Sequence, residues 1–332
     1  MYRFPQLRSE KKLARIAVLT SGGDAPGMNA SIRAIVRAGG AEGIEVFGVY
    51  RGYSGLVEGD IRPLSSASVA NILHRGGTCL KSDRCEEFHY SAVRQKVAET
   101  LREMAIEALV VIGGDGSLTG AHLFQQETGF PVIGIPGTID NDITGTEDTI
   151  GFDTAVNTAL DAIDRIRDTA NSHDRLFLVE VMGRNSGFIA AQAGIAGGAE
   201  MILIPNRPIE FKAICHSLDQ SRIKGRLSSI VVIAEGEPGS TQKLAHKLEK
   251  NGYEPRVCIL GHTQRGGAPT GHDRVLASSL GAMAISHLQA GISDVMLSVQ
   301  QNEILAVPLE KTLEPRVFES EVLLELAKKL RG

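Results

Sequence analysis

An apolar run that stops at a cluster of glycines constrains this chain more than any other stretch of its sequence. Residues 109–117 read LVVIGGDGS, and a short apolar run with a glycine stop is typical of a strand buried on both faces. The glycines let the chain turn sharply and bring bare backbone close to a ligand, and Ser117 is then placed to cap a helix over residues 118–126. Because N–H groups at the start of a helix bind anions, the stretch predicts a phosphate-binding turn.

Two further features indicate that a magnesium ion accompanies the phosphate. Asp115 would repel phosphate, and its presence makes sense if Mg2+ lies between them; a solvated Asp in an ordinary tight turn is the alternative. Residues 130–142 read FPVIGIPGTIDND, a second apolar strand followed by Asp140 and Asp142. Parallel strands separated by one helix can lie side by side, so we expect these carboxylates at the edge where open α/β sheets bind ligands.

Strands and helices alternate along the chain, which predicts a parallel sheet with helices on both faces. The first strand, residues 15–19, ends in TSGGDAPGMNA and is followed by a helix over 28–38 and a strand over 44–50. We place a second α/β domain after these elements, because a new set of strands occurs at residues 176–181, 201–204, 230–234 and 257–260. Neither GxGxxG nor GxxxxGK[ST] occurs, which argues against the standard dinucleotide and P-loop sites.

Length, charge and cysteine content narrow the class of protein. A chain of 332 residues suits two domains, and a formal net charge of -4 gives no electrostatic case for nucleic acid. The four cysteines form no CxxC pair, so they fit free thiols in a reducing cytoplasm. The first dozen residues lack an apolar signal core, and no run approaches the roughly 20 apolar residues of a membrane span. We therefore expect a cytoplasmic protein that binds neither nucleic acid nor membrane.

Six motifs make the chain resemble the phosphofructokinase family from about residue 13 to at least residue 290. In chain order they read LTSGGDAPGMNA, RGGT, VVIGGDGS, PGTIDNDI, EVMGRNSG and LGHTQRGG. A GGDG turn also occurs in the NAD-kinase and diacylglycerol-kinase group, whereas PGTIDND together with MGR and GHxQRGG is highly specific. The resemblance implies Mg2+-dependent transfer of a phosphoryl group from ATP to the 1-hydroxyl of fructose 6-phosphate, usually in a homotetramer.

The resemblance also implies a domain organisation that local patterns cannot reveal. We expect two three-layer α/β/α domains with mainly parallel sheets and the active site in the cleft between them. The ATP-binding domain would comprise residues 13–151 plus approximately 264–312. The sugar-phosphate-binding domain would comprise approximately 152–263 plus 313–332.

The same resemblance implies the site residues. Asp140 would take the proton of the sugar hydroxyl, with Thr138 and Arg184 beside the transferred phosphoryl group, and Asp115 and Asp142 would hold Mg2+ directly or through water. The remaining residues of the nucleotide site would be Gly23, Tyr53, Arg84, Cys85, Gly114, Gly116, Ser117 and Gly120. The sugar phosphate would be bound by Thr138, Asp140, Arg175, Met182, Gly183, Arg184, Glu235, Arg256, His262 and Arg265. Arg175 and Arg256 would come from a neighbouring subunit.

Two small residues bear on the phosphoryl donor. Pyrophosphate-dependent relatives typically have Asp and Lys where this chain has Gly116 and Gly137. An Asp at 116 would crowd and repel the α-phosphate of ATP, so two glycines favour ATP. The alternatives are a pyrophosphate-dependent enzyme of the same fold, an NAD-kinase-like enzyme and a non-catalytic regulatory subunit that binds sugar phosphate. The presence of Asp115, Asp140 and Asp142 argues against the last.

The sequence does not decide whether effectors regulate this protein. Bacterial members of the family have an effector site between subunits for ADP and phosphoenolpyruvate. Charged positions of that site are matched here by Arg33, Arg37, Arg167, Glu200, Lys224 and Arg226. Ser66 and Ser228 depart from the pattern, because an Arg and a His are common there, so both retention and loss of effector control are compatible with the sequence.

Overall fold

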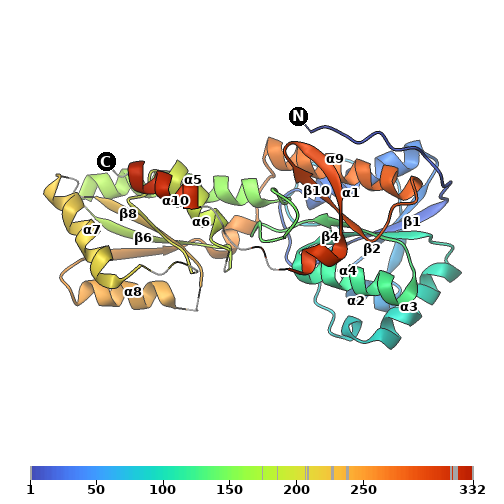
Figure 1. Cartoon of the computed structure of the whole chain (residues 1–332), viewed down its shortest axis with the longest axis horizontal. Helices are drawn as coiled ribbons and strands as arrows, with labels where there is room; N and C mark the ends of the chain where they lie inside the picture. The colour runs from blue at the N-terminus through green and yellow to red at the C-terminus, as the bar shows by residue number, and fades with distance from the viewer. Residues whose placement is uncertain are drawn as a thin grey trace. The chain divides into compact units, whose positions relative to one another are not determined.

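The computed structural model describes residues 2–173, 175–184, 186–205, 207, 209–225, 228–236, 239–314, 316 and 321–330. Two compact units make up the chain, and Figure 1 labels their elements. Unit 1 comprises Met1–Asp153 and Arg265–Arg316, and unit 2 comprises Thr154–Gln264 and Val317–Gly332. Each unit is therefore built from segments that are distant in the sequence.

Unit 1 is built on a seven-stranded sheet in the order β11-β10-β5-β4-β1-β2-β3. Its strands are β1 (Arg15–Ser21), β2 (Glu45–Val49), β3 (Ile61–Leu64), β4 (Ala108–Gly113), β5 (Val132–Pro136), β10 (Val295–Gln300) and β11 (Glu303–Pro308). The central strands run parallel, whereas β3 and β11 pair antiparallel with their neighbours at the two ends of the sheet. Every residue of β4 is buried, as expected for a strand covered on both faces.

Helices cover both faces of this sheet. They are α1 (Met28–Ala41), α2 (Gly52–Glu58), α3 (Ser91–Glu103), α4 (Asp115–Thr128) and α9 (Gly271–Gln289), with short 3-10 turns η1 (Glu87–His89) and η3 (Leu309–Leu313). Helices α1 and α9 pack together on one face, and α2, α3 and α4 lie on the other (Figure 1). Gly281 permits the close approach of α1 and α9, because a Cβ there would lie 2.6 Å from the carbonyl oxygen of Ser31.

Unit 2 repeats the same architecture on a smaller scale. Its parallel sheet has the order β7-β8-β6-β9. The strands are β6 (Leu176–Val181), β7 (Met201–Leu203), β8 (Ser229–Ala234) and β9 (Pro255–Ile259). The helices are α5 (Phe152–His173), which begins in unit 1, α6 (Phe188–Ala196), α7 (Phe211–Ile223), α8 (Ser240–Glu249) and α10 (Glu321–Leu330), and η2 (Gly261–Arg265) is a 3-10 turn.

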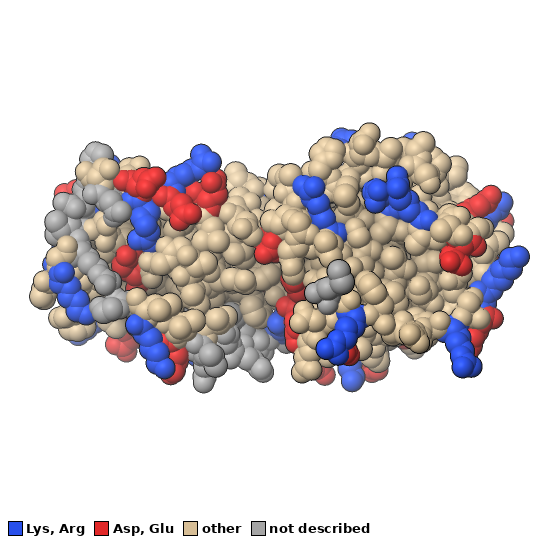
Figure 2. Space-filling model, turned by 90° about the horizontal axis from the view of Figure 1, so that it is seen from above, with Lys and Arg blue, Asp and Glu red and all other residues tan. Residues whose placement is uncertain are grey.

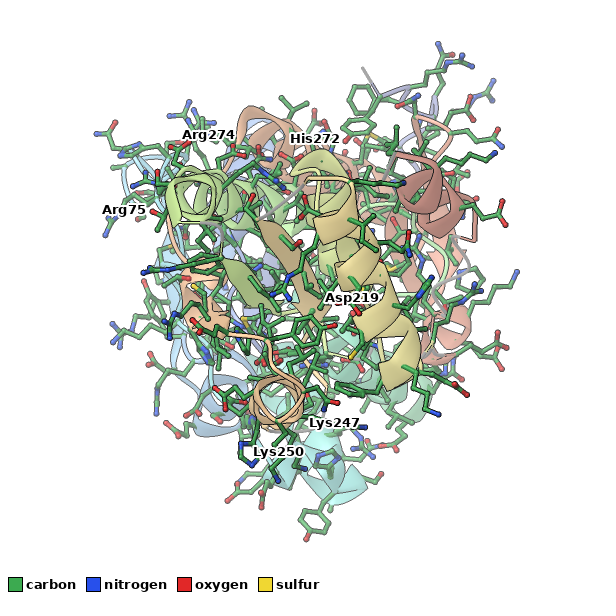
Figure 3. All side chains as sticks on the ribbon, turned by 90° about the vertical axis from the view of Figure 1, so that its left-hand side faces the viewer. Arg75, Asp219, Lys247, Lys250, His272 and Arg274 are labelled. Atoms are coloured by element: carbon green, nitrogen blue, oxygen red, sulfur yellow. The ribbon has the colours of Figure 1, made fainter. Side chains whose placement is uncertain are left out.

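Tyr253 connects two helices of unit 2, α7 and α8. Its ring belongs to an apolar cluster with Ile214 and Leu218 of α7 and Leu248 of α8. Its hydroxyl donates to Oδ1 of Asp219 at 2.7 Å, and Asp219 is labelled on α7 in Figure 3. The connection between α8 and β9 is thereby fastened to α7, which helps to fix the start of β9.

The predicted α/β class with mainly parallel sheets is confirmed, but the predicted role of Ser117 is wrong. Helix α4 begins at Asp115, its N-cap residue is Gly114, and no side chain of the described residues caps it there. The carbonyl oxygen of Gly114 already accepts a hydrogen bond from the N–H of Leu118 at 3.0 Å. Because the backbone becomes helical directly after the glycines, Ser117 lies inside the first turn, where it is buried.

The surface of the described residues agrees with the charge expected from composition. In the view of Figure 2, Lys and Arg side chains are interspersed with Asp and Glu rather than gathered into one basic patch. Among the described helices, none is both long and apolar enough to cross a membrane.

Candidate active site

Three strands of unit 1 end at the same level of the sheet. Residues Ser21 of β1, Gly113 of β4 and Pro136 of β5 are aligned across the strands by the parallel register. The prediction that the strand ends before GGDGS and PGTIDND lie side by side is confirmed. TSGGD, GGDGS and TID therefore leave the sheet at one edge, the edge at which open α/β sheets bind ligands.

The GGDGS turn exposes its acidic residue and its helix N-terminus. Asp115 and Gly116 are exposed at the start of α4. Gly113 must lack a side chain, because a Cβ would lie 2.6 Å from the carbonyl oxygen of Ser21. The N–H groups of the first turn of α4 thus lie next to a carboxylate and bare backbone, which suits a phosphate bound together with a hard cation.

Tyr53 supports this turn from the inside of unit 1. Its buried ring stacks on Phe88 with ring centroids 4.1 Å apart, and its hydroxyl donates to the carbonyl oxygen of Ser117 at 2.7 Å. Burial raises the pKa of Tyr53 far above its ordinary value, so the hydroxyl stays protonated and remains a donor. The ring also fills the space beside Gly120, where a Cβ would lie 3.2 Å from Cε2 of the tyrosine. Both residues position α4.

A loop between β3 and η1 packs against the TSGGD turn. The hydroxyl of Ser82 donates to the carbonyl oxygen of Gly22 at 2.5 Å, and the hydroxyls of Thr20 and Thr78 are 2.8 Å apart. This loop carries Arg84, which is exposed, and Cys85, which packs partly buried against the apolar core. Arg84 is thus available to a ligand at the edge where β1 ends.

Gly23 and Arg265, predicted to bind different substrates, lie together in unit 1. The guanidinium of Arg265 covers the backbone of Gly23 so closely that a Cβ would collide with it. Nη1 of Arg265 also donates to the carbonyl oxygen of Asp24 at 3.2 Å. The cation therefore lies against the TSGGD turn, and its predicted contact with the sugar phosphate stays a prediction.

The TIDND loop contains a buried carboxylate beside a more accessible one. Asp140 is 1% exposed, whereas Asp142 is half-buried. The backbone here is held by Thr138, whose hydroxyl accepts from the N–H of Asp140 at 3.2 Å and whose carbonyl accepts from the hydroxyl of Thr149 at 2.7 Å. A buried carboxylate on a backbone held in this way suits proton transfer at a fixed point.

The donor set fits a magnesium ion that keeps other ligands. Among the described residues, no three or more His, Cys, Asp or Glu side chains form a ready cluster for a metal. Mg2+ is usually bound by one or two carboxylates together with water and substrate phosphates, so this finding is compatible with Asp115 and Asp142, whose role as magnesium ligands stays a prediction.

Unit 2 brings a second group of predicted residues to its own strand ends. Strands β8, β6 and β9 are adjacent, and they are followed by Glu235, by the Met182–Gly183–Arg184 turn and by His262. Oε1 of Glu235 accepts from the N–H of Arg184 at 2.9 Å, although Glu235 was predicted as a sugar ligand. Arg184 has φ 48, in the left-handed region that a non-glycine residue adopts only where its surroundings hold it.

Gln264 is a residue of this site that sequence reasoning missed. Its side chain is completely buried, and Oε1 accepts from the N–H of Met182 at 2.8 Å. Nε2 donates to the carbonyl oxygen of Ala155 in α5 at 3.4 Å. Gln264 therefore holds the MGR turn from beneath. The signal in the sequence was its place inside GHTQRGG, between two residues assigned to the ligand.

The predicted cations of unit 2 differ in exposure. Arg256 is exposed on β9, next to the exposed Val257 and after the buried Pro255. His262 is exposed in η2, whereas Arg175 is half-buried directly before β6. Of the described strands, only β6 pairs with β9, so the outer side of β9 ends the sheet. An exposed edge strand carrying a cation is accessible to a second protein chain.

The predicted effector residues fall into separate groups. In unit 2, Nη2 of Arg167 donates to the carbonyl oxygens of Gly197 and Gly198 at 2.6 and 2.8 Å, and Glu200 accepts from the N–H of Ile230 at 2.6 Å. These two side chains thus fasten the end of α6 and the start of β8. Arg33 and Arg37 lie on α1 of unit 1, Lys224 is exposed after α7, and Arg226 lies outside the described residues. Effector control stays a prediction.

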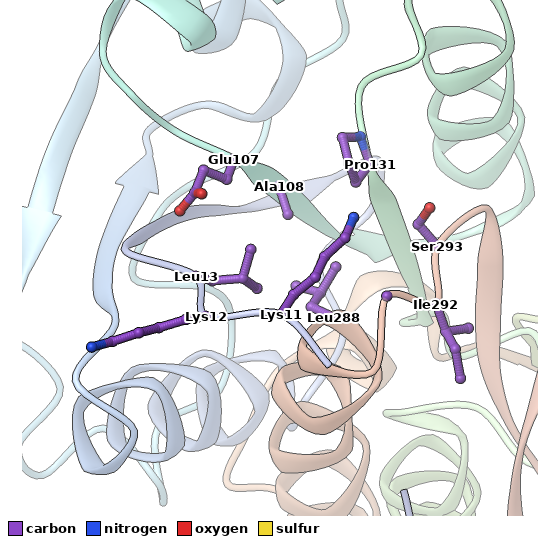
Figure 4. A pocket seen from close by; sticks show the side chains of 10 residues that line it. Lys11, Lys12, Leu13, Glu107, Ala108, Pro131, Leu288, Ile292 and Ser293 are labelled. Atoms are coloured by element: carbon purple, nitrogen blue, oxygen red, sulfur yellow. The ribbon is translucent and has the colours of Figure 1, made fainter. Parts of the chain in front are cut away.

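A cavity of about 240 Å³ lies at the opposite edge of the unit 1 sheet (Figure 4). Ala108 at the start of β4, Pro131 just before β5 and Leu288 near the end of α9 contribute to its wall, together with Lys11. This cavity is therefore distinct from the strand ends that carry the predicted site residues.

Comparisons with known proteins identify the family. The model of the family described as Phosphofructokinase matches residues 15–288. ATP-dependent 6-phosphofructokinase 1 of Thermus thermophilus is 52% identical over 320 residues, which cover 96% of this chain and 99% of the relative. ATP-dependent 6-phosphofructokinase of Thermotoga neapolitana is 50% identical over 313 residues, covering 92% of this chain and 98% of the relative.

A solved structure of a phosphofructokinase is also similar to this chain. Phosphofructokinase of Pichia pastoris in the T-state superposes with a TM-score of 0.85 at 37% identity over 91% of this chain. The matched part spans 35% of the Pichia chain, so that protein is much longer. With a family match over most of its length and relatives of about half identical sequence, this chain belongs to the phosphofructokinase family.

Proposed function

We propose that this chain transfers the γ-phosphoryl group of ATP to the 1-hydroxyl of fructose 6-phosphate, which gives fructose 1,6-bisphosphate and ADP. The observation that carries the proposal is the buried carboxylate of Asp140, which comes after β5 at the same sheet edge as the GGDGS turn. A carboxylate fixed at this edge is a proton acceptor in place for a transfer reaction, which a site that only binds nucleotide does not require.

In this proposal the residues of unit 1 align the phosphates and receive the proton. Asp140 accepts the proton of the sugar hydroxyl as that oxygen attacks the γ-phosphorus. Asp115 and Asp142 hold Mg2+, which when bound neutralises charge on the phosphate oxygens. Thr138 lies beside the attacked group. Phosphoryl transfer depends mainly on such alignment and charge neutralisation, because the protein forms no covalent bond.

The nucleotide is proposed to bind across the glycine turns of unit 1. The backbone of Gly23, Gly114 and Gly116 approaches the phosphates, and the first turn of α4 around Ser117 offers N–H groups to them. The exposed guanidinium of Arg84 pairs with phosphate oxygens. The proposed nucleotide site also includes Cys85, Tyr53 and Gly120. The hydrogen bond from Tyr53 to Ser117 supports a role for Tyr53 in positioning α4.

The two glycines that bear on the donor have different neighbours. Around Gly116 there is open space within 4 Å of a Cβ, so packing does not explain the absence of a side chain. At Gly137 a Cβ would lie 3.0 Å from Cε of Met28 and 3.1 Å from Cγ2 of Ile112, so tight packing is a second reason for that glycine besides the donor. The support for ATP as donor therefore comes from Gly116, together with the names of the relatives.

Unit 2 is proposed to bind fructose 6-phosphate. Arg184 lies near the transferred group, Glu235 and the Met182–Gly183 backbone contact sugar hydroxyls, and His262, with Arg265 of unit 1, binds phosphate oxygens. Arg175 and Arg256 complete the site of a neighbouring subunit in a homotetramer. The exposed position of Arg256 on the edge strand β9 supports this assignment. The four free thiols of the described cysteines agree with a reducing cytoplasm as the place of the reaction.

The test is formation of fructose 1,6-bisphosphate from fructose 6-phosphate and Mg2+, with ATP and with pyrophosphate in parallel reactions. We expect product with ATP alone. Product with pyrophosphate alone would overturn the donor assignment but keep the catalytic residues. Folded protein that yields no product with either donor would contradict the proposed reaction. Light scattering of the same sample determines the mass of the oligomer, and a monomer would contradict the shared site.

A further inference from the structure

The loop that carries Asp140 and Asp142 contains a backbone conformation that must be held in place. Asn141, between the two carboxylates, has φ 49 and is 3% exposed. A non-glycine residue in the left-handed region costs free energy and persists only where surrounding contacts stabilise it. The direction of the flanking side chains depends on this residue, because a turn of the backbone at position 141 would redirect both.

One contact comes from the far end of unit 1. Nη1 of Arg316 donates to the carbonyl oxygen of Asn141 at 3.1 Å and to its Oδ1 at 3.3 Å. Arg316 is 175 residues away in sequence and is half-buried. A single cationic donor therefore bridges the backbone and the side chain of the strained residue, which fixes their relative orientation.

A second contact ties Asn141 to the sheet. Nδ2 of Asn141 donates to the carbonyl oxygen of Glu147 at 3.1 Å. Glu147 is itself anchored to the β10–β11 hairpin: its N–H donates to the carbonyl oxygen of Val299 at 2.9 Å, and its Oε2 accepts from the N–H of Gln301 at 3.0 Å. The strands of this hairpin pair over six residues each, and β10 also pairs with β5, so the hairpin belongs to the main sheet of unit 1. Asn141 is thus held from two sides, by Glu147 and by Arg316.

We propose that Arg316 is a positioning residue for phosphoryl transfer. By donating to both oxygens of Asn141 it stabilises the left-handed turn and so orients the carboxylates of Asp140 and Asp142. It acts through Asn141 and has no direct contact with substrate in this account. The inference rests on the proposed roles of Asp140 as proton acceptor and Asp142 as magnesium ligand.

The first test compares Arg316→Met with Arg102→Met. Arg102 is a matched control because its guanidinium also donates to a backbone carbonyl of unit 1, that of Thr128 at 2.6 Å, between the ends of α3 and α4. Since a displacement of about 1 Å in a reacting group can cost about 100-fold in rate, we expect Arg316→Met to lower kcat by about 10- to 100-fold. The KM for fructose 6-phosphate should stay within about twofold of the control, because the groups proposed to bind the sugar phosphate are unchanged. The rise in Tm on adding this sugar phosphate should also stay within about twofold of the control. An unchanged kcat would overturn the proposal.

The second test asks whether Arg316 acts through Asn141. Asn141→Gly keeps the left-handed backbone without strain but removes both side-chain contacts. If the two residues form one unit, the double variant should lose no more kcat than the worse single variant, because coupled changes are not additive. Losses that multiply in the double variant would show that Arg316 acts by another route. Arg316→Lys keeps a donor and should recover part of kcat, which a purely packing role would not predict.

A third measurement does not depend on the reaction. Hydrogen exchange of the backbone N–H groups at residues 140–147 should be faster in Arg316→Met than in Arg102→Met, since a contact that holds the turn is lost. Equal exchange would overturn the positioning role even if kcat fell. If instead the wild-type protein forms no fructose 1,6-bisphosphate while the exchange difference is present, the proposed function fails and the structural link between Arg316 and the loop stands.

Discussion

Units 1 and 2 share an architecture but differ in the residues at the ends of their strands. In unit 1 the strand ends carry glycine turns and carboxylates, and the central carboxylate, Asp140, is buried. In unit 2 the strand ends carry Arg184 and His262, both exposed, with Arg256 exposed on the edge strand. One sheet edge therefore presents a buried carboxylate and bare backbone, and the other presents exposed basic side chains.

This difference predicts a division of labour between chemistry and binding. A buried proton acceptor contributes mainly when the proton moves, that is, in the transition state. A guanidinium that binds the 6-phosphate, which takes no part in the reaction, binds it equally in the ground state and the transition state. Substitution of Asp140 in unit 1 should therefore change kcat, whereas substitution of Arg256 in unit 2 should change the KM for fructose 6-phosphate.

The largest effect is expected for Asp140→Asn. Removing the proton acceptor should lower kcat by about 100- to 10,000-fold, the usual range for general base catalysis, with little change in the KM for fructose 6-phosphate. Steady-state kinetics with saturating ATP measure both constants. Asp60→Asn is the control, because that carboxylate pairs with Arg62 on the surface of unit 1. A near-normal kcat in Asp140→Asn would contradict the role of Asp140 as proton acceptor, and with it the proposed division between the two units.

Arg256→Ala should have the next largest effect, and this effect should be on the KM for fructose 6-phosphate rather than on kcat. Loss of charge-assisted hydrogen bonds to the 6-phosphate, about 1.5–3 kcal/mol, should raise the KM for fructose 6-phosphate by about 10- to 150-fold while kcat changes little. Arg165→Ala, which removes an exposed pair with Asp161 on α5, serves as the control. A fall in kcat at unchanged KM would place Arg256 in the chemical step instead.

A pair of glycine substitutions should separate packing from ligand binding within unit 1. Gly137→Ala places a Cβ against Met28 and Ile112 and should lower the free energy of unfolding by about 1–3 kcal/mol. Gly116→Asp enters open space, so its Tm should stay near that of the wild type while the KM for ATP rises. Thermal melts and ATP titrations of the two variants test this. A large loss of stability in Gly116→Asp would mean that its glycine is structural as well.

The smallest expected effect is on the pH dependence of folding stability, at a contact in the loop that carries Asp140. His272 at the start of α9 hydrogen-bonds the carboxylate of Asp148, which raises the pKa of His272 above its ordinary 6.5; Asp153, Asp273 and Tyr2 also face it (Figure 3 labels His272). A raised pKa means that the folded state favours the protonated form. The stabilisation is therefore present below pH 6.5 and is lost as the pH rises through the folded-state pKa.

His272→Gln should accordingly lower the Tm at acidic pH and converge with the wild type at alkaline pH, with a difference below about 1 kcal/mol because the pair is partly exposed. His287, near the other end of α9, is a contrast within the same helix, since burial lowers its pKa. Its contribution to stability should fall as the pH is lowered. Parallel slopes for the wild type and His272→Gln would show that the Asp148 contact contributes nothing.

Local patterns in the sequence predicted much of the fold and the broad location of the site. Apolar runs with glycine stops marked β1, β4 and β5, and the one-helix spacing correctly predicted that β4 and β5 are neighbours. The start of α4 was misjudged, because only the backbone shows that the chain is helical directly after Gly114.

The residues that hold the site together could not be predicted in this way. Gln264 bonds a residue 82 positions away, and Arg316 bonds one 175 positions away. Such long-range contacts leave no periodic signal. For Gln264 the sequence offered its place inside GHTQRGG, whereas a lone Arg in a sequence is indistinguishable from one with no role. The same holds for the tight contacts that a Cβ at Gly137 would make with Met28 and Ile112.

Calorimetric titration of fructose 6-phosphate into the Asp140→Asn protein tests the division between the units most directly. The account predicts that this variant binds the sugar phosphate with an affinity within about threefold of the wild type, although it forms almost no product. A loss of affinity that parallels the loss of kcat would contradict it, because Asp140 would then be part of the binding surface rather than the group that accepts the proton.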